Sequence, residues 1–148
     1  MSEAIPQQLV VFSLGSEEYA LPIGSVHEII RYSEPRAIAS EVPWIRGVIG
    51  LRGKIIPIFD LAARMGLEPT GSEPGKIVIV ESGAGQAGVI VDDVEEVLTV
   101  GAEQLEDVPS ASRESIVAVA KIGDRLVVLL NAEGLFAPAA AEELVAPA

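Results

Sequence analysis

Cysteine is absent from this chain of 148 residues, and histidine occurs once, at His27. The lack of cysteine excludes disulfides, thiolate metal ligands and a cysteine nucleophile, and it is compatible with a reducing cytoplasm. A Ser-His-Asp triad would have to use His27, which lies beside Glu28 in a predicted strand with no nucleophile motif nearby. We therefore predict no catalytic residues and no enzymatic activity.

Positive charge is also scarce, with 10 Lys and Arg against 22 Asp and Glu and a formal net charge of −12. Nucleic acids and anionic lipids draw affinity from Lys and Arg, so neither nucleic-acid binding nor direct membrane contact is expected. Long apolar runs are missing, because stretches such as Leu126–Leu130 are too short to span a bilayer. The first six residues have no signal-peptide pattern, and we expect a soluble, cytoplasmic protein.

What the chain does contain is a series of short apolar and β-branched runs separated by turn residues. Regular spacing of such runs, with few helical stretches, predicts an all-β fold of small barrels. The ten predicted strands are Leu9–Phe12, Tyr19–Leu21, Val26–Arg31, Val48–Leu51, Lys54–Phe59, Lys76–Val80, Val89–Val91, Val94–Val100, Ile116–Ile122 and Arg125–Leu130.

Helix is expected only in short pieces. Asp60 can cap a helix at Leu61–Met65, and Gly66 can end it. Further candidates are Asn131–Phe136 and a turn near Ala102–Leu105.

Domain organisation follows from composition. Residues 7–136 are predicted to form one domain, with a flexible N-terminus (1–6) and a mobile Ala/Pro-rich tail (137–148). The Pro- and Gly-rich segment 68–75 is the expected internal boundary between two halves.

The most informative stretch is Gly47-Val-Ile-Gly-Leu-Arg-Gly-Lys-Ile-Ile-Pro-Ile-Phe-Asp-Leu61, preceded by Pro43-Trp-Ile-Arg46. Its Arg52-Gly53 pair predicts a tight hairpin turn with an outward-pointing arginine. This stretch closely resembles the signature of the CheW-like coupling proteins of bacterial chemotaxis. Similar matches occur, in the family's order, at Val26–Ile29, Gly88–Val94 and Asp124–Asn131. One departure is Gly50, where the family usually has Asn.

The resemblance implies a CheW-like fold of two five-stranded SH3-like barrels side by side, in which strands may cross between the halves. It also implies a receptor-binding groove carrying Gly47, Ile49, Leu51 and Arg52. A kinase-binding strand would carry Val26, Glu28 and Ile30, which share one face by the two-residue period. We expect these to be separate surfaces.

Other features have simpler interpretations. Gly83–Gly88 spells G-x-G-x-x-G, but strand rather than helix follows, so a hairpin is predicted and not a dinucleotide site. The acidic residues Asp92, Asp93, Glu95 and Glu96 lack the spacing of a calcium loop and predict a solvated strand face. Trp44 is either a core plug, which we favour, or an interface anchor. No cofactor or metal is expected.

The resemblance thus implies an adaptor that couples the cytoplasmic tip of methyl-accepting chemoreceptors to a CheA-type histidine kinase, through that kinase's CheW-like regulatory domain. It would be recruited from the cytoplasm to receptor arrays at the membrane. An adaptor of a non-flagellar array, controlling twitching motility or gene expression, is the nearer alternative. A small-ligand-binding β-barrel or a small hydrolase is the more distant one.

Overall fold

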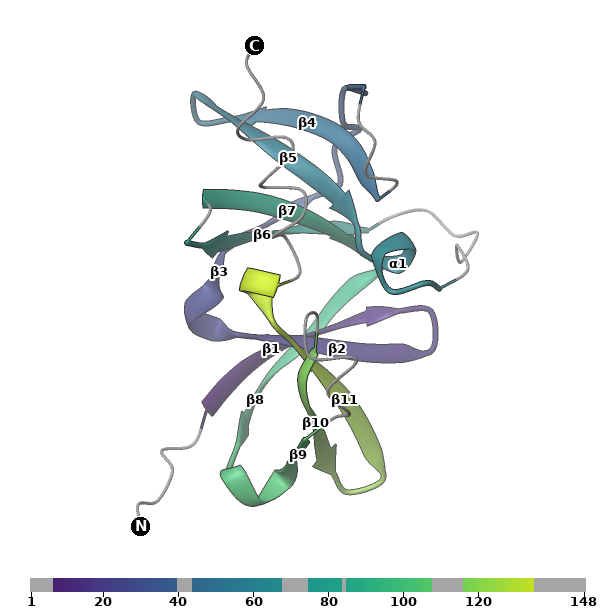
Figure 1. Ribbon diagram of the computed structural model, residues 1–148, viewed down its shortest axis with the longest axis vertical. Helices are drawn as coiled ribbons and strands as arrows, with labels where there is room; N and C mark the ends of the chain where they lie inside the picture. The colour runs from purple at the N-terminus through teal and green to yellow at the C-terminus, as the bar shows by residue number, and fades with distance from the viewer. Residues whose placement is uncertain (1–6, 40–43, 68–74, 84, 108–115, 135–148) are drawn as a thin grey trace.

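The computed structural model describes residues 7–39, 44–67, 75–83, 85–107 and 116–134. These residues form eleven strands in two sheets, one above the other in Figure 1. The upper, five-stranded sheet has the order β3–β6–β7–β5–β4, and the lower, six-stranded sheet has the order β8–β1–β2–β11–β10–β9. The all-β prediction is confirmed, with one strand more than the ten expected.

The strands have these bounds: β1 Gln7–Leu14, β2 Glu17–Pro22, β3 Val26–Arg31, β4 Ile45–Leu51, β5 Lys54–Asp60, β6 Lys76–Ser82, β7 Gly85–Val91, β8 Asp93–Val100, β9 Leu105–Asp107, β10 Ile116–Ile122 and β11 Arg125–Leu130. The additional strand is β9, a three-residue strand that pairs with β10.

The chain crosses between the two sheets. The N-terminal hairpin β1–β2 belongs to the lower sheet, where β1 pairs with β8 and β2 pairs in parallel with β11. The strands of the upper sheet, β3 to β7, all come from the segment between β2 and β8 in the sequence. Segment 68–75 therefore connects two elements of the upper half and does not divide the sheets, contrary to the prediction; residues 68–74 themselves lie outside the described ones.

Three clusters of buried apolar residues form the core. One lies within each sheet: Leu9, Val11 and Leu129 belong to the lower cluster, whereas the upper one is formed mainly by isoleucines such as Ile56 and Ile77. The central cluster joins residues of both sheets, including Phe12, Leu21, Phe59, Val78 and Val89, with Leu61 of helix α1. Because the side chains of β1 alternate between faces, this one strand contributes to the lower and central clusters.

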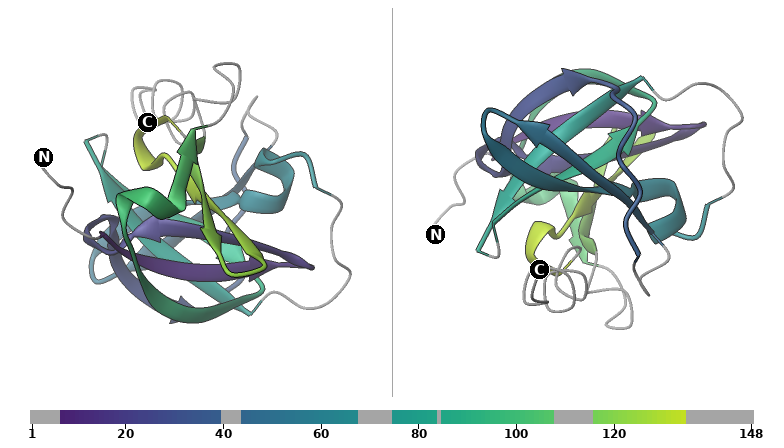
Figure 2. Two further views of the ribbon diagram at one scale, coloured as in Figure 1. Left: turned by 90° about the horizontal axis from the view of Figure 1, so that it is seen from below. Right: turned by 90° about the horizontal axis from the view of Figure 1, so that it is seen from above.

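The upper sheet closes on itself through the segment after β3. Arg36 forms a bridge with Val48 of β4, with backbone N–O distances of 2.8 and 2.9 Å. Because β3 and β4 are the two ends of the sheet order, this bridge brings the first and last strands together. The hairpin β4–β5 therefore lies beside the chain that leaves β3, as Figure 2 shows from above.

Helices are short, as predicted. Helix α1 (Leu61–Arg64) is capped by Asp60, whose Oδ1 accepts a hydrogen bond from the Ala63 N–H at 3.2 Å, and Gly66 follows with φ +77°. The 3-10 turns η1 (Ile23–Ser25) and η2 (Ala102–Gln104) precede β3 and β9, and residues 132–134 are helical. Within the described residues no helix is long and apolar enough to cross a membrane. The predicted termini 1–6 and 137–148 lie outside these residues.

Candidate functional site

The β4–β5 hairpin has the predicted two-residue turn. Leu51 pairs with Lys54, and both turn residues have positive φ, 53° at Arg52 and 81° at Gly53. This conformation matches the twist of the two strands, and it costs least at the glycine. Arg52 is consequently held at the tip of the hairpin, with 65% of its side chain exposed.

Arg52 is nevertheless not free in solvent. Its Nη2 lies 3.1 Å from Oε2 of Glu28 on β3, and the Glu28 side chain is only 21% exposed. The sequence assigned these two residues to separate surfaces, and the structure corrects this: the closure of the upper sheet brings the hairpin tip next to β3. The candidate receptor and kinase surfaces are therefore contiguous.

The other predicted receptor-binding residues lie beneath this surface. Gly47 and Ile49 are buried, and Leu51 packs half-buried against the upper cluster. The alternation of β4 instead turns Val48 and Gly50 outward. Of the four predicted residues, Arg52 is thus the one that is exposed to a partner.

The predicted kinase-binding residues also lie on the more buried face of their strand. Val26, Glu28 and Ile30 are half-buried, with Val26 against the central cluster and Ile30 against the upper one. The exposed face of β3 carries the alternating set His27, Ile29 and Arg31, of which Ile29 is 40% exposed. The two-residue period was predicted correctly, but it does not tell which face is buried.

A shallow pocket of about 400 Å³ lies on the outer side of β4. Its apolar part comes from the β4–β5 hairpin and its polar rim from the segment after β3. The lining residues are Ser33, Glu34, Arg36, Val48, Ile49, Gly50 and Ile55.

Next to this hairpin, Trp44 and Asp60 tie β4 to helix α1. Trp44 is partly buried against the central cluster, and its carbonyl accepts a hydrogen bond from the Asp60 N–H at 2.7 Å. Arg64 lies 4.7 Å above the tryptophan ring, and Asp60 also pairs with Arg46 at 3.1 Å. The position of Trp44 favours its role as a core plug.

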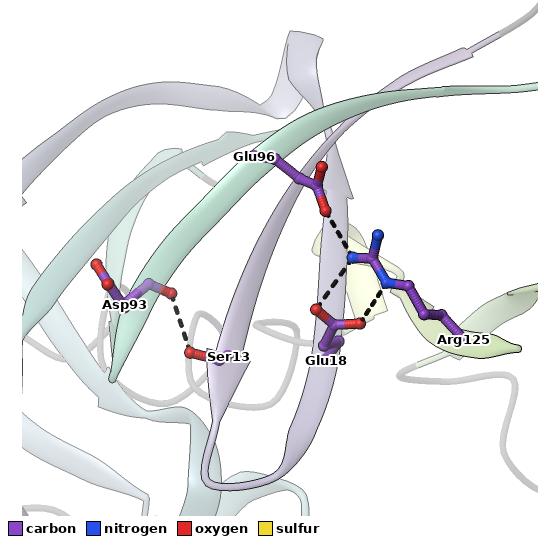
Figure 3. Close-up of polar contacts among 5 residues, drawn as sticks. All are labelled: Ser13, Glu18, Asp93, Glu96 and Arg125. Atoms are coloured by element: carbon purple, nitrogen blue, oxygen red, sulfur yellow. Dashed lines mark hydrogen bonds and ion pairs between the residues drawn. The ribbon is translucent and has the colours of Figure 1, made fainter. Parts of the chain in front are cut away.

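Two acidic residues of β8, Asp93 and Glu96, have partners within the chain (Figure 3). Arg125 of β11 binds both carboxylate oxygens of Glu18 at 3.0 Å and Glu96 at 2.6 Å, and hydrogen bonding to Glu18 and then Glu96 raises its pKa further above the usual range. The Lys76 ammonium and the Val94 N–H hold the pKa of Asp93 below its ordinary value. Ser13 donates to the Asp93 carbonyl.

In the described part of the chain, no three His, Cys, Asp or Glu residues lie close enough together to hold a metal ion. The glycines of the G-x-G-x-x-G pattern lie in the β6–β7 hairpin, and Gly83 N–H donates to Glu133 at 2.8 Å. The described residues of this turn lead from strand β6 into strand β7 and begin no helix, whereas a pyrophosphate site needs the N–H groups of a helix N-terminus.

Charge is divided unevenly between the halves. Residues 26–91, which include the whole upper sheet, contain seven Lys and Arg and seven Asp and Glu. The entire net charge of −12 therefore belongs to the rest of the chain, which includes the lower sheet. The half that carries Arg52 is the one better suited to receive an anionic group.

Comparison with known proteins agrees with this architecture. The model of the CheW-like domain matches residues 8–140. The chain belongs to the CheW-like family. It is 33% identical to the chemotaxis protein CheW of Klebsiella aerogenes, over 90% of this chain and 83% of that protein. It is 32% identical to the probable chemotaxis protein CheW of Rhizobium etli, over 92% and 91%.

A solved structure shows the same fold. The crystal structure of the scaffolding protein TtCheW from Thermoanaerobacter tengcongensis superposes with a TM-score of 0.82 at 36% identity, covering 89% of this chain and 93% of that one. The predicted CheW-like fold is thus confirmed. So is the predicted function class, because CheW-like coupling proteins are adaptors between chemoreceptors and the kinase CheA.

Proposed function

We propose that this CheW-family protein is a non-enzymatic adaptor that holds methyl-accepting chemoreceptors and a CheA-type kinase in one signalling array. The observation that carries the proposal is the position of Arg52. It lies at the tip of a two-residue hairpin turn, largely exposed, near an open pocket and next to the strand proposed for the kinase. No other cation of the described residues combines these features.

The receptor tip, a helical hairpin, would contact Arg52 and the outer side of β4. Arginine suits such a contact because its planar fork makes two hydrogen bonds while its stem packs on apolar neighbours. Gly47, Ile49 and Leu51 would act from beneath, since they set the path of β4. An amphipathic helix laid in a shallow groove is a common mode of recognition.

The kinase would dock through its CheW-like regulatory domain along β3. Val26, Glu28 and Ile30 would shape this strand, whose exposed side presents Ile29 between two polar residues. Such a half-apolar strand face fits an interface of moderate strength. The adaptor would thereby be recruited from the cytoplasm to arrays at the membrane.

Replacing Arg52 by Ala tests the receptor half of this proposal. Affinity for the organism's receptor-tip fragment should fall by about 2 kcal/mol, roughly thirtyfold, if the side chain lies at the centre of the contact. Stability should change by no more than about 0.5 kcal/mol, because the side chain is mostly exposed. Titration of labelled receptor fragment against each variant measures the first effect, and urea denaturation the second.

Two further variants separate contact from ion pairing. Glu28→Gln removes the same ion pair but keeps Arg52, so it should retain receptor affinity and weaken binding of the kinase regulatory domain. Lys121→Ala removes a comparable exposed pair, with Glu106 at 3.0 Å, on the lower sheet and should alter neither affinity. A folded Arg52→Ala protein with unchanged receptor affinity would refute the assignment.

A further inference from the structure

The shallow pocket near Arg52 contains open space where Gly50 has no side chain. Gly50 faces outward on β4 directly opposite Ile55 of β5, and a Cβ placed on it would meet no atom within 4 Å. Its φ lies outside the range that favours glycine, so the backbone does not require glycine here. Gly50 therefore leaves open space on the outer face of β4 that a larger side chain could fill.

The wall of this space is apolar. Ile55 is 72% exposed, more than any other large apolar residue in the described part of the chain. With Val48 it forms an uncovered apolar strip next to Gly50. A partner side chain placed over Gly50 would remove this strip from water and gain the corresponding free energy.

The rim of the pocket carries one arginine, Arg36, and one carboxylate, Glu34. Arg36 is exposed, its backbone is held to Val48 by two hydrogen bonds, and its guanidinium makes no ion pair with the described residues. The neighbouring Glu34 accepts a hydrogen bond from the Tyr32 hydroxyl at 3.1 Å. Because Arg36 forms no ion pair with Glu34 or with any other described residue, its guanidinium can bind a carboxylate of a partner.

We propose that Gly50 and Ile55 form a specificity pocket that receives one bulky apolar side chain of the receptor tip, while Arg36 pairs with a carboxylate next to it. This inference rests on the proposed receptor-binding function. The receptor is the occupant because the pocket continues from Arg52, two residues along the same hairpin. Arg36, which pairs with no described carboxylate, also favours a partner segment in which an apolar residue adjoins Asp or Glu.

Filling the pocket is the direct test. Gly50→Leu should weaken binding of the receptor-tip fragment about tenfold or more, because the leucine occupies the place of the receptor side chain. Gly24→Leu is the matched control, since Gly24 also has open space and an ordinary φ but lies in η1. The full-length proteins are titrated with the receptor fragment and, separately, with the kinase regulatory domain.

Two variants probe the wall and the rim without filling the pocket. Ile55→Ser, at a position that is exposed in the fold, and Arg36→Gln should each weaken receptor binding several-fold and leave kinase binding unchanged. Ile55→Ser decides the question if Gly50→Leu fails to fold. Receptor variants with the apolar residue cut to Ala should lose the difference between the wild-type and Ile55→Ser adaptors.

Failure of this inference is distinct from failure of the proposed function. If the wild-type protein does not bind the receptor fragment, the proposed function is overturned. If it binds but Gly50→Leu or Ile55→Ser binds equally well, only the specificity pocket is overturned. The pocket is likewise overturned if Gly24→Leu shows the same loss, or if the kinase domain is the partner whose affinity falls.

Discussion

At the scale of single residues, two glycines of β4 do opposite things. Gly50 leaves space that nothing fills, whereas Gly47 is needed for close contact. Gly47 has φ +149°, and a Cβ there would lie 2.1 Å from the carbonyl oxygen of Arg36. It sits at the register shift of β4 against β5, which is where a strand bulges. The closure of the upper sheet therefore depends on Gly47.

Replacing Gly47 by Ala should destabilise the protein by more than about 2 kcal/mol, since the new methyl group clashes with backbone and the residue keeps an unfavourable φ. Urea denaturation monitored by Trp44 fluorescence measures the loss. Gly24→Ala, with open space and an ordinary φ, should stay within about 0.5 kcal/mol. Equal midpoints for the two variants would contradict the role given to Gly47.

At the scale of elements, the sequence allowed most strands to be predicted but not their faces. All ten predicted runs lie in strands, because apolar and β-branched runs between turn residues are a local signal. Whether Val26 or His27 faces the core depends on the strand it packs against, and that information is not local. The ion pair of Arg52 with Glu28 was missed for the same reason, since it follows from sheet closure.

Short and shifted elements were also missed for physical reasons. Strand β9 has three residues, too few to show a period, and it is stabilised by pairing with β10. Strand β7 begins at Gly85, four residues before the apolar run, because its glycines lack the side chains that mark a strand. Gly88 lies so close to Ile58 and Ile77 that a Cβ would be 2.7 Å from either.

Arg125 joins β11 to β2 and β8 through two carboxylates, those of Glu18 and Glu96. Arg125→Lys keeps the charge but loses the planar fork that binds Glu18 at two points. We expect the melting temperature to fall by a few degrees in Arg125→Lys and further in Arg125→Met, because Glu18 and Glu96 then repel without compensation. Thermal unfolding at low and high salt provides the measurement.

Salt serves as the internal control for this prediction. Repulsion between exposed carboxylates is screened at high ionic strength, so added salt should recover part of the loss in Arg125→Met. Receptor and kinase binding should be unaffected, since the cluster lies on the lower sheet. A variant as stable as the wild type at low salt would show that the cluster contributes nothing to the fold.

At the scale of the whole molecule, the two halves are not consecutive in sequence. The Pro- and Gly-rich segment 68–75 predicted a boundary. Pro and Gly are common in any long connection, however, and they do not tell which strands pair across it. The parallel pairs β2–β11 and β5–β7 gave no local signal either. They are set by the central cluster, to which both sheets contribute.

A fragment ending at residue 75 should therefore fail to fold. It contains β1 to β5 but lacks β6 and β7 from the middle of the upper sheet, and it lacks β8 and β11, the partners of the N-terminal hairpin. Thermal circular dichroism should show no cooperative transition, in contrast to the full chain. A sigmoidal transition with strand content near half that of the full protein would contradict this topology.

The crossing of the N-terminal hairpin also has a consequence in time. During synthesis β1 and β2 emerge before the strands β8 and β11 that flank them, and Glu18 pairs with Val127, a residue made more than a hundred positions later. At about 5–20 residues per second, the hairpin must wait on the order of 5–20 s for its last neighbour. Both faces of β1 are apolar, with Leu9 and Val11 on one and Phe12 and Leu14 on the other. Until β8 and β11 have been synthesised, this hairpin exposes apolar side chains on both faces. It is therefore expected to bind chaperones that recognise exposed strands, which would prevent aggregation before folding is complete.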